Sequence, residues 1–385
     1  MKVAYVTTYD ARSLKGSNEW SGTGYYIAQS LEKQVLSLEY IGPLSDSVAL
    51  EAARKIKSRF YKAFYAKNYQ KDADPATLRN YARQITHKLA HSKSDIVFSA
   101  TINPIAYLDC EQPIVFWADG TFANVQNFYP LYSNLPEEVI RDWHHIEQLA
   151  LERCKLAIYS SDWAAKSAVH DYGADPSKVK VISFGSNTES PFTSDSIQAV
   201  IDSRPSDCCN LLFLGVDWIR KGGNVAYQVA KKLNQAGLKT KLTIVGCEPL
   251  IEETLPEFVE PLGFISKSTE AGKAKIQKLL MESHFLILPT LADCTPIVFC
   301  EANSLGVPCL STTVGGVPTM IYDDVNGRLF DPSADITEYC DYITNLFTNY
   351  SSYRELALSA FHEYESRLNW GVAGQNVKDL LMTLV

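Results

Sequence analysis

Two carboxylates, Asp293 and Glu301, flank a turn and the start of a helix. Residues 284–289 form an apolar run that ends in this turn, which predicts a buried strand. Thr295 is a favourable N-cap residue. Pro296 is a favourable first helical residue, because an amide N–H at that position would have no helical partner. The segment therefore predicts a helix that begins directly after a carboxylate-bearing loop.

The start of this helix has the properties of an anion site. The amides of Ile297 and Val298 would point out of its positive end, which favours a phosphate. Glu301 lies five residues beyond Pro296, a rise of roughly 7 Å, which is comparable to the length of a diphosphate. One carboxylate could hold hydroxyls of a transferred sugar and the other those of a ribose. A capped helix with an acidic residue also has a purely structural explanation.

Cations follow another expected strand, residues 210–216. Arg220 and Lys221 stand in a turn with two glycines that allow close backbone approach, just before an expected helix. A positioned cation of this kind could stabilise the charge on a departing diphosphate, and the loss of one such contact commonly costs ~3 kcal/mol. The alternative is a solvated basic turn.

Two glycine-containing loops also come before expected helices. Gly315 and Gly316 follow a strand and precede a proline, which suits close approach of a sugar or phosphate but also occurs in ordinary turns. Gly22, Thr23 and Gly24 follow the first strand through a long loop. The third glycine and the short turn of a dinucleotide fingerprint are missing there, which argues against a nicotinamide site.

Asp119 follows the expected strand at residues 113–118. It is a candidate to orient a substrate hydroxyl or to act as a base. The alternative is that it caps the turn after the strand.

The elements that would position these residues alternate along the whole chain. Short apolar runs rich in Val, Ile, Leu and Phe suit strands buried on both faces, and strand–helix alternation implies parallel sheets. The expected strands are residues 2–7, 38–42, 95–99, 113–118, 156–160, 178–184, 210–216, 241–246, 284–289, 308–312 and 327–330. The clearest expected helices are residues 25–35, 76–90, 137–152, 224–235 and 271–282.

A polar, turn-rich stretch near residues 185–210 separates two such series. A chain of 385 residues also exceeds the usual size of one core. We therefore expect two doubly wound α/β domains, residues 1–185 and 186–365, that face each other across a cleft. In such sheets ligands bind at the carboxyl ends of the strands, where each candidate residue above is expected.

Composition excludes several classes of protein. The content of 46% hydrophobic and 21% charged residues is that of a globular chain, and the net charge of −8 argues against a general nucleic-acid binder. No apolar run reaches the length of a membrane span, and the start lacks the features of a secretory signal. Nine cysteines without Cys-x-x-Cys spacing indicate reduced thiols in a cytoplasmic compartment.

A basic, aromatic segment covers residues 54–71 and contains no acidic residue. It carries Arg54, Lys55, Lys57, Arg59, Lys62, Lys67 and Lys71 together with Phe60, Tyr61, Phe64, Tyr65 and Tyr69. A basic amphipathic helix can lie on an anionic membrane surface, which predicts peripheral contact with the inner membrane face. It could also bind a phosphorylated or lipid acceptor. The alternative is a helix that packs through its aromatic face and keeps its lysines in water.

The order of these motifs resembles glycosyltransferase family 4. The resemblance rests on Gly215 with Lys221-Gly222, on Val245-Gly246, on Asp293-x7-Glu301, and on Gly315-Gly316 followed by Asn326-Gly327. It covers nearly the whole chain and is most specific between residues 210 and 331. It implies the GT-B fold, in which two Rossmann-like domains face each other across a cleft and a last helix, here about residues 366–385, crosses back to the first domain.

The resemblance also implies roles for the residues that match. Glu301 would bind the ribose and Asp293 the donor sugar, while Lys221 and the amides of Ile297 and Val298 would contact the diphosphate. Gly22 and Gly24 would match a glycine loop near the phosphate and the acceptor.

Three positions depart from the family pattern. Asp293 stands where the family has Glu, and Val216 stands where an Arg is common, although Arg220 could substitute for it. The segment around Asp119 has no His, which many members carry near the reacting carbon. These departures affect the donor-side details more than the fold.

The resemblance predicts a retaining hexosyltransferase that uses a UDP-, GDP- or ADP-sugar as donor and transfers to a glycan, lipid or small molecule. We expect no cofactor, no metal ion and no nucleic-acid partner. Two other functions stay open from the sequence: a nucleotide-sugar-binding scaffold without turnover, and a UDP-sugar epimerase on the same fold. The base, the sugar and the acceptor are not specified by any residue pattern.

Overall fold

The computed structural model describes residues 1–14, 22–34 and 36–385. Trp20, Ser21 and Val35, which belong to the expected first loop and helix, lie outside these residues. The chain forms two compact units. Unit 1 comprises Met1–Ser183 and Ala373–Val385, and unit 2 comprises Phe184–Val372. The sequence boundary was expected at residue 185 and the return of the chain at about residue 366.

Unit 1 is built on a six-stranded, fully parallel sheet in the order β2-β1-β3-β4-β5-β6. Its strands are β1 Lys2–Val6, β2 Ser37–Ile41, β3 Ile96–Ser99, β4 Ile114–Ala118, β5 Leu156–Tyr159 and β6 Val179–Val181. Every residue of β3, β4 and β5 is buried, as expected for apolar strands covered on both faces.

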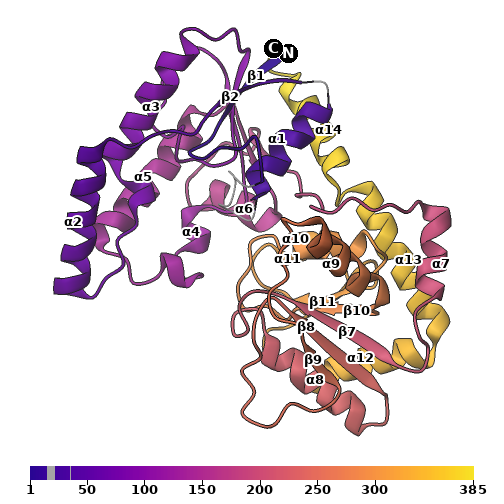
Figure 1. Cartoon of the computed structure of the whole chain (residues 1–385). Helices are drawn as coiled ribbons and strands as arrows, with labels where there is room; N and C mark the ends of the chain where they lie inside the picture. The colour runs from indigo at the N-terminus through magenta and orange to yellow at the C-terminus, as the bar shows by residue number, and fades with distance from the viewer. Residues whose placement is uncertain (15–21, 35) are drawn as a thin grey trace. The chain divides into compact units, whose positions relative to one another are not determined.

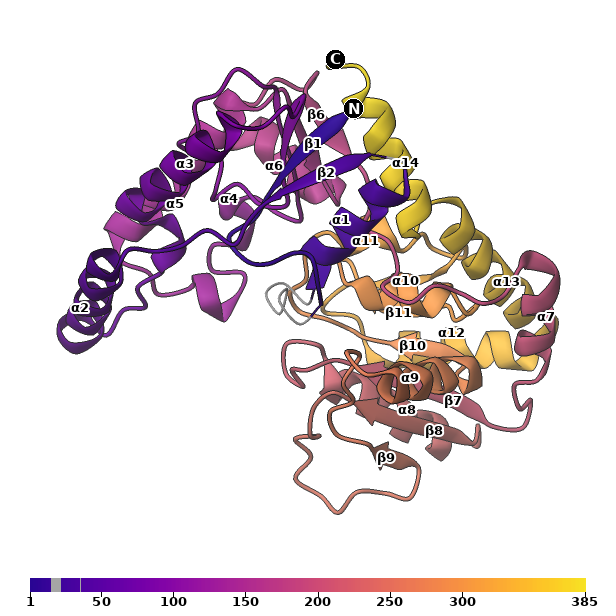
Figure 2. The same cartoon turned by 45° about the horizontal axis from the view of Figure 1, so that its top comes forward.

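The helices of unit 1 are α1 Thr23–Lys33, α2 Val48–Tyr65, α3 Pro75–Leu89, α4 Phe122–Val125, α5 Glu137–Arg153, α6 Asp162–His170 and α14 Trp370–Leu381, of which the last begins in unit 2. Two short 3-10 helices, η2 Lys71–Ala73 and η3 Pro130–Tyr132, lie in the connections. Figures 1 and 2 show α1 and α14 on one side of the sheet and α3 and α5 on the other.

Unit 2 contains a second six-stranded parallel sheet, in the order β12-β11-β10-β7-β8-β9. Its strands are β7 Cys209–Leu214, β8 Thr240–Val245, β9 Val259–Pro261, β10 Phe285–Ile287, β11 Cys309–Thr312 and β12 Gly327–Phe330. The order runs outward in both directions from the neighbours β7 and β10, which pair with Phe285 opposite Leu211. This pair is the topological switch point, where such sheets bind ligands.

The helices of unit 2 cover both faces of this sheet (Figures 1 and 2). They are α7 Ser194–Asp202, α8 Gly223–Gln235, α9 Glu270–Glu282, α10 Ile297–Asn303, α11 Val317–Met320, α12 Ile336–Thr348 and α13 Tyr350–Ser366. A single buried core joins the strands to α8, α10, α12 and α13. The prediction of two doubly wound parallel sheets is confirmed, and the expected cleft stays a prediction.

All eleven expected strands are present, and one strand was missed. β9 has only three residues, ends in Pro261 and lies at the edge of its sheet. A proline cannot donate a ladder hydrogen bond, so strands that contain it are confined to edges and give a weak pattern.

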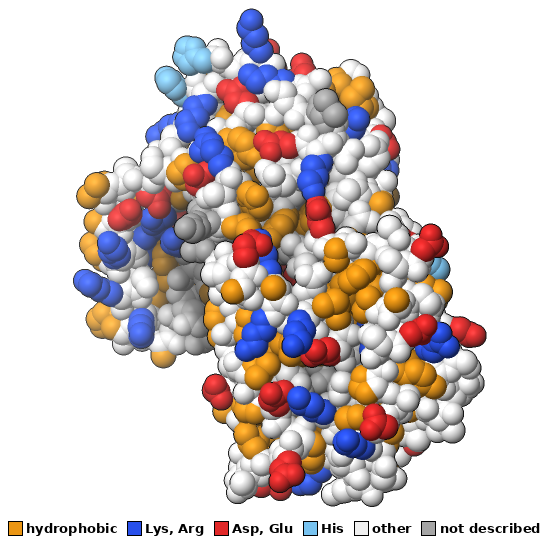
Figure 3. Space-filling view, turned by 45° about the vertical axis from the view of Figure 1, so that its right-hand side comes forward, with side chains coloured by type: hydrophobic (Ala, Val, Ile, Leu, Met, Phe, Trp, Pro, Cys, Tyr) orange, Lys and Arg blue, Asp and Glu red, His pale blue; other side chains and the backbone are white. Residues whose placement is uncertain are grey.

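No helix among the described residues is long and apolar enough to cross a membrane. On the face drawn in Figure 3, Lys and Arg side chains lie interspersed with Asp and Glu, so no broad basic area covers that face.

Candidate functional site

Two loops meet at the switch point of unit 2. Lys221 follows β7 and Asp293 follows β10, and these strands are hydrogen-bonded neighbours although the two residues are 72 positions apart. Because the strands are parallel, both loops leave from the same edge of the sheet. The topology therefore brings the predicted cation and the first predicted carboxylate together.

Lys221 and Asp293 form a buried ion pair. The Nζ of Lys221 donates to Oδ2 of Asp293 at 2.6 Å, and each side chain is only 11% exposed. The Thr290 hydroxyl lies 2.9 Å from the same oxygen, and Nη1 of Arg220 is 3.6 Å from Oδ1. Three donors thus surround one carboxylate, which is what a buried charge requires.

The turn before α8 explains why glycine is needed beside Lys221. Gly222 has φ of +76°, and a Cβ at this position would lie 1.9 Å from the Pro289 carbonyl oxygen. Any other residue would push the two loops apart. The Leu291 amide also donates to the Arg220 carbonyl at 2.7 Å, so backbone contacts lock the loops together.

The Lys221 ammonium is largely shielded from water. Burial lowers the pKa of Lys221, with a further lowering from the neighbouring Arg220, while the charge of Asp293 acts in the opposite direction. The guanidinium of Arg220 also donates to the Ala292 carbonyl at 2.8 Å. The edge therefore presents two cations beside two carboxylates, Asp293 and Asp217, the second of which lies 3.6 Å from Arg220.

Glu301 lies in α10 and is 1% exposed. Its Oε2 accepts a hydrogen bond from the Lys267 ammonium, whereas its buried Oε1 has no hydrogen-bond partner. An unsatisfied buried oxygen on a charged group is costly. The missing partner points to a hydroxyl or amide supplied by a ligand.

The start of α10 differs from the sequence prediction. Pro296 is the N-cap residue, the first helical residue is Ile297, and no side chain caps the helix. Thr295 therefore lies before the cap, because Pro296 takes an extended conformation (φ −68°, ψ 108°). Ile297 and Val298 occupy the first two helical positions, whose amides have no acceptor within the helix.

The glycine pair of the β11 loop reaches the same place. The Gly316 amide donates to the Asp293 carbonyl at 3.2 Å, and Gly316 is the residue before α11. Gly315 precedes it. The structure thus joins the Lys221 turn, the Asp293 loop and the glycine pair at one edge.

The remaining candidates lie in unit 1. Gly22 and Thr23 stand at the start of α1, and Gly24 packs so closely that a Cβ would lie 1.8 Å from the Tyr9 hydroxyl oxygen. Packing alone accounts for this last glycine. Asp119 follows β4, as expected.

The helix that follows Asp119 is capped by Thr121, whose hydroxyl accepts from the Asn124 amide at 3.3 Å. Both expected roles of Asp119, a substrate contact or a cap of the turn after β4, stay predictions. The Phe122 amide donates at 3.0 Å to the buried Glu147 of α5, and this hydrogen bond ties the start of α4 to α5.

Sequence reasoning missed two side chains of the site. Lys267 lies in the connection after the undetected β9, and Thr290 is one residue of an apolar run with no charge to mark it. Neither position carries a local signal. Among the residues that the structure describes, no group of three His, Cys, Asp or Glu side chains could hold a metal ion.

Comparison with known families gives a match in unit 2. Residues 209–349, which include β7, Lys221, Asp293 and Glu301, match the family described as glycosyl transferases group 1. The match covers 141 of the 385 residues of the chain. The match confirms, for this part of the chain, the resemblance found in its motifs.

The curated relatives of this chain are distant in sequence. The chain is 24% identical over 264 residues to D-inositol 3-phosphate glycosyltransferase of Mycolicibacterium smegmatis, covering 67% of this chain and 59% of the relative. It is 22% identical over 276 residues to that of Mycobacterium marinum, covering 70% and 57%. The chain thus spans less than two thirds of these relatives' length.

Solved structures match the whole chain. Sucrose-phosphate synthase from Thermosynechococcus elongatus aligns with a TM-score of 0.67 at 13% identity, covering 100% of this chain and 99% of the other. Anabaena Alr3699/HepE in complex with UDP-glucose aligns with a TM-score of 0.61 at 15% identity, covering both chains completely. The chain that carries this glycosyl transferases group 1 domain therefore has the GT-B fold.

Proposed function

We propose that the protein is a retaining glycosyltransferase that moves a hexose from a nucleoside diphosphate sugar to an acceptor and needs no metal ion. One observation carries the proposal. The buried pair of Lys221 and Asp293 lies at the switch point of a glycosyl transferases group 1 domain.

The donor would use the cations beside Asp293 and the first residues of α10. Its diphosphate would take Lys221 and Arg220 as counter-ions, together with the amides of Ile297 and Val298. A ribose hydroxyl would donate to the unpaired Oε1 of Glu301. This arrangement leaves Asp293, beside Lys221, for the hydroxyls of the sugar.

The reaction would follow a front-face path. The bond between the anomeric carbon and the diphosphate oxygen breaks, and an oxocarbenium-like state forms. The acceptor oxygen then bonds to the same face of the carbon, and its proton passes to the departing diphosphate. Lys221 would stabilise the charge on this leaving group. Electrostatic stabilisation of this kind commonly lowers the barrier by ~3 kcal/mol.

Turnover with a panel of donors tests the proposal. UDP-, GDP- and ADP-sugars would be incubated with the protein, and release of nucleoside diphosphate would be followed with wild type and with Glu301→Ala. We start with UDP-glucose because the similar fold of Anabaena Alr3699/HepE was solved with it. Release that Glu301→Ala abolishes, with retained anomeric configuration by NMR, supports the proposal.

Two outcomes would overturn it. Tight binding of nucleotide sugars without release across all donors would indicate a scaffold. An isomerised sugar in the NMR spectrum, with no transfer, would indicate an epimerase. Activity that depends on an added divalent ion would contradict the metal-independent part of the proposal.

We further propose that α2 contacts the inner membrane face from the cytoplasmic side. Arg54 is the only buried residue described in this helix, and Ile56, Phe60 and Phe64 are 68%, 47% and 75% exposed. The rings of Phe60 and Phe64 are neighbours at 5.1 Å. The helix ends at Tyr65, so it contains the first part of the basic, aromatic segment at residues 54–71.

The face of α2 that packs on unit 1 makes polar contacts, together with the ring of Tyr61, which stacks on Tyr69 at 6.0 Å. Arg54 pairs with Asp46 at 2.5 Å and donates to the Thr77 hydroxyl at 3.2 Å. Lys57 pairs with Glu138 at 2.9 Å, and the Tyr61 hydroxyl donates to the same carboxylate at 2.6 Å. The apolar side chains therefore face outward among exposed lysines, as in helices that lie at a membrane surface.

Vesicle flotation tests this contact. Wild type should float with vesicles that contain phosphatidylglycerol and not with phosphatidylcholine alone. The pair Phe60→Ser with Phe64→Ser, and separately Lys55→Gln with Lys62→Gln, should each reduce the bound fraction severalfold. Lys278→Gln, an exposed lysine of α9, is the control. Equal flotation of all variants would remove the proposal.

A further inference from the structure

A second basic feature lies on α3, beside the proposed membrane helix. Arg79 and Arg83 stand one turn apart on the exposed face of α3 and line a hollow of about 550 Å³. The other lining residues are Ala82, Thr86, His87, Tyr107 and Asp109. A hollow of this size is within the range of small-molecule sites.

Neither arginine has an acidic partner among the described residues. The same is true of Arg59, Arg141, Arg153 and Arg204, whereas the other six of the twelve arginines pair with carboxylates. Those that do are Arg12, Arg54, Arg220, Arg328, Arg354 and Arg367. Two like charges one helical turn apart repel each other slightly, so the pair contributes nothing to the helix itself.

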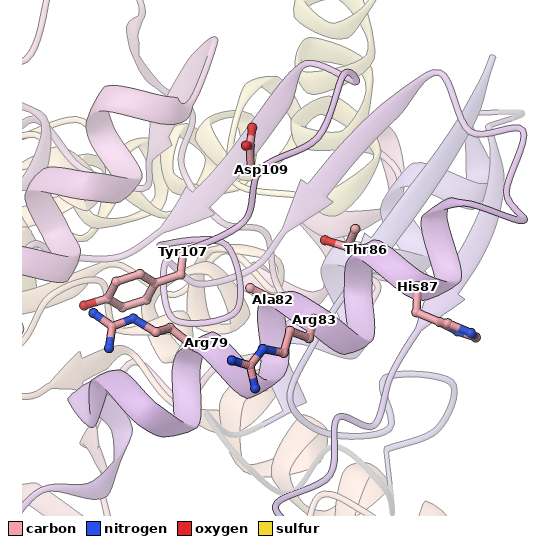
Figure 4. A pocket seen from close by; sticks show the side chains of 7 residues that line it. All are labelled: Arg79, Ala82, Arg83, Thr86, His87, Tyr107 and Asp109. Carbon is pink, nitrogen blue, oxygen red and sulfur yellow. The ribbon is translucent and has the colours of Figure 1, made fainter.

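The hollow holds Arg79 in position. Its guanidinium lies over the ring of Tyr107 at 4.8 Å, which restricts its motion. In Figure 4 the guanidinium of Arg79 lies next to the Tyr107 hydroxyl, that of Arg83 lies farther along α3, and His87 points away. Asp109, the one acid of the lining, lies near the top of the view, away from the guanidinium of Arg79.

The donors match a phosphate group. Each guanidinium offers a planar pair of N–H groups, and a phosphate monoester has three acceptor oxygens and close to two negative charges at neutral pH. Burial raises the pKa of Tyr107, so its hydroxyl stays protonated and can donate as well. The small side chains of Ala82 and Thr86 leave the floor of the hollow open.

We propose that Arg79, Arg83 and Tyr107 form a binding site for a phosphate monoester, separate from the proposed donor site in unit 2. The phosphate can come from a soluble phosphorylated compound or from a lipid headgroup. The hydrogen bond from Arg54 of α2 to Thr77 of α3 places the site next to the helix proposed to meet a membrane, so both sources can reach it.

Calorimetry with the full chain tests the soluble source. Glucose 6-phosphate would be titrated into wild type, into the double variant Arg79→Gln with Arg83→Gln, and into Lys88→Gln. Lys88 is an exposed cation of the same helix that does not line the hollow, so it is the matched control. We expect at least tenfold weaker binding for the double variant and less than a twofold change for the control.

Flotation tests the lipid source. Vesicles with phosphatidic acid, a phosphate monoester, would be compared with vesicles of phosphatidylglycerol, a diester, for the same three proteins. A loss by the double variant on phosphatidic acid alone assigns the headgroup, because charge attraction through α2 would change on both.

Weaker binding by the double variant can be told apart from a loss of folding. Both arginines are exposed and make no ion pair, so the double variant should melt at the temperature of wild type. Hydrogen exchange of residues 79–87 should slow when glucose 6-phosphate is added to wild type and not to the double variant. If the double variant binds both ligands as wild type does, the proposal is overturned, whatever happens at the donor site.

Discussion

The pair of Lys221 and Asp293 gives a prediction that separates folding from binding. Three variants are needed: Lys221→Met, Asp293→Asn and the two combined. Methionine keeps most of the volume of lysine, and asparagine keeps the shape of aspartate. Each single variant leaves one buried charge without its partner, and the combined variant leaves neither.

The expected magnitudes follow from the contacts. Breaking a buried ion pair from one side costs about 3–5 kcal/mol. For Lys221→Met we expect about 3 kcal/mol, because Arg220 remains 3.6 Å from Asp293. For Asp293→Asn we expect about 2 kcal/mol, because burial already lowers the pKa of Lys221, which can lose its proton. The combined variant should lie within about 1 kcal/mol of wild type, which is a coupling of about 4 kcal/mol.

Hydrogen–deuterium exchange in β7 and β10 measures these energies for unit 2 by itself. A loss of about 3 kcal/mol makes exchange through unfolding of the unit about 150-fold faster. Lys232→Met is the control, since the Lys232 side chain is 45% exposed and its ion pair with Asp335 is long, at 3.8 Å. A combined variant as unstable as Lys221→Met would refute the buried-pair reasoning.

Ligand affinity provides the second measurement on the same variants. The combined variant should fold normally and still bind nucleoside diphosphate about 100-fold more weakly, because the cation that meets the diphosphate is gone. Restored stability with restored affinity would show that Lys221 has only a structural role.

Three further predictions concern buried charges. Glu301→Gln keeps the shape but loses the charge that pairs with Lys267, so nucleoside diphosphate should bind about tenfold more weakly in calorimetry; an equal loss for free pyrophosphate would contradict a ribose contact. Burial raises the pKa of Glu147 to about 8, so the folded state holds a proton that the unfolded state releases above about 4.3, and stability should fall by about 1.5 kcal/mol from pH 6.5 to 8. Urea unfolding of Glu147→Gln should lack this slope, and an unchanged slope would exclude Glu147 as its source. Burial lowers the pKa of His284 to about 3, so protonation of the unfolded state should reduce stability as pH falls from about 6.5 towards 3; His284→Gln should flatten this acid limb, and an acid limb as steep as that of wild type would count against it.

The sequence was sufficient to predict the two sheets and to place Lys221 and Asp293 each after a strand. Strands that are buried on both faces have a strong apolar pattern, and parallel crossovers leave few topologies. That these strands, β7 and β10, are neighbours is seen only in the structure, and it brings both residues to one edge. Their contact at 2.6 Å, however, depends on Gly222, whose φ of +76° lets the two loops touch.

Other features depended on contacts that no local pattern reveals. Lys267 reaches Glu301 from a connection whose strand, β9, is only three residues long. Pro296, and not Thr295, is the N-cap residue of α10 because the backbone of Pro296 is extended. Residue preferences at helix starts do not predict this. For α2 the amphipathic pattern was visible, but which face would pack was decided by the partners Asp46 and Glu138.

The pairing of Lys221 with an internal carboxylate restricts which ligands can use it. A ligand with one negative charge would only replace the Asp293 carboxylate as the partner of Lys221. A diphosphate carries more negative charge and can also pair with Arg220. Once Lys221 turns to the diphosphate, Asp293 is left buried with Thr290 and needs new donors, which the hydroxyls of a donor sugar supply. Asp293→Asn removes this need. We therefore expect the variant to bind nucleoside diphosphate at least as tightly as wild type and to lose the tighter binding of the sugar nucleotide, measured by calorimetry with both ligands. If the variant lost both ligands equally, Asp293 would be a structural partner of Lys221 and not a contact of the sugar.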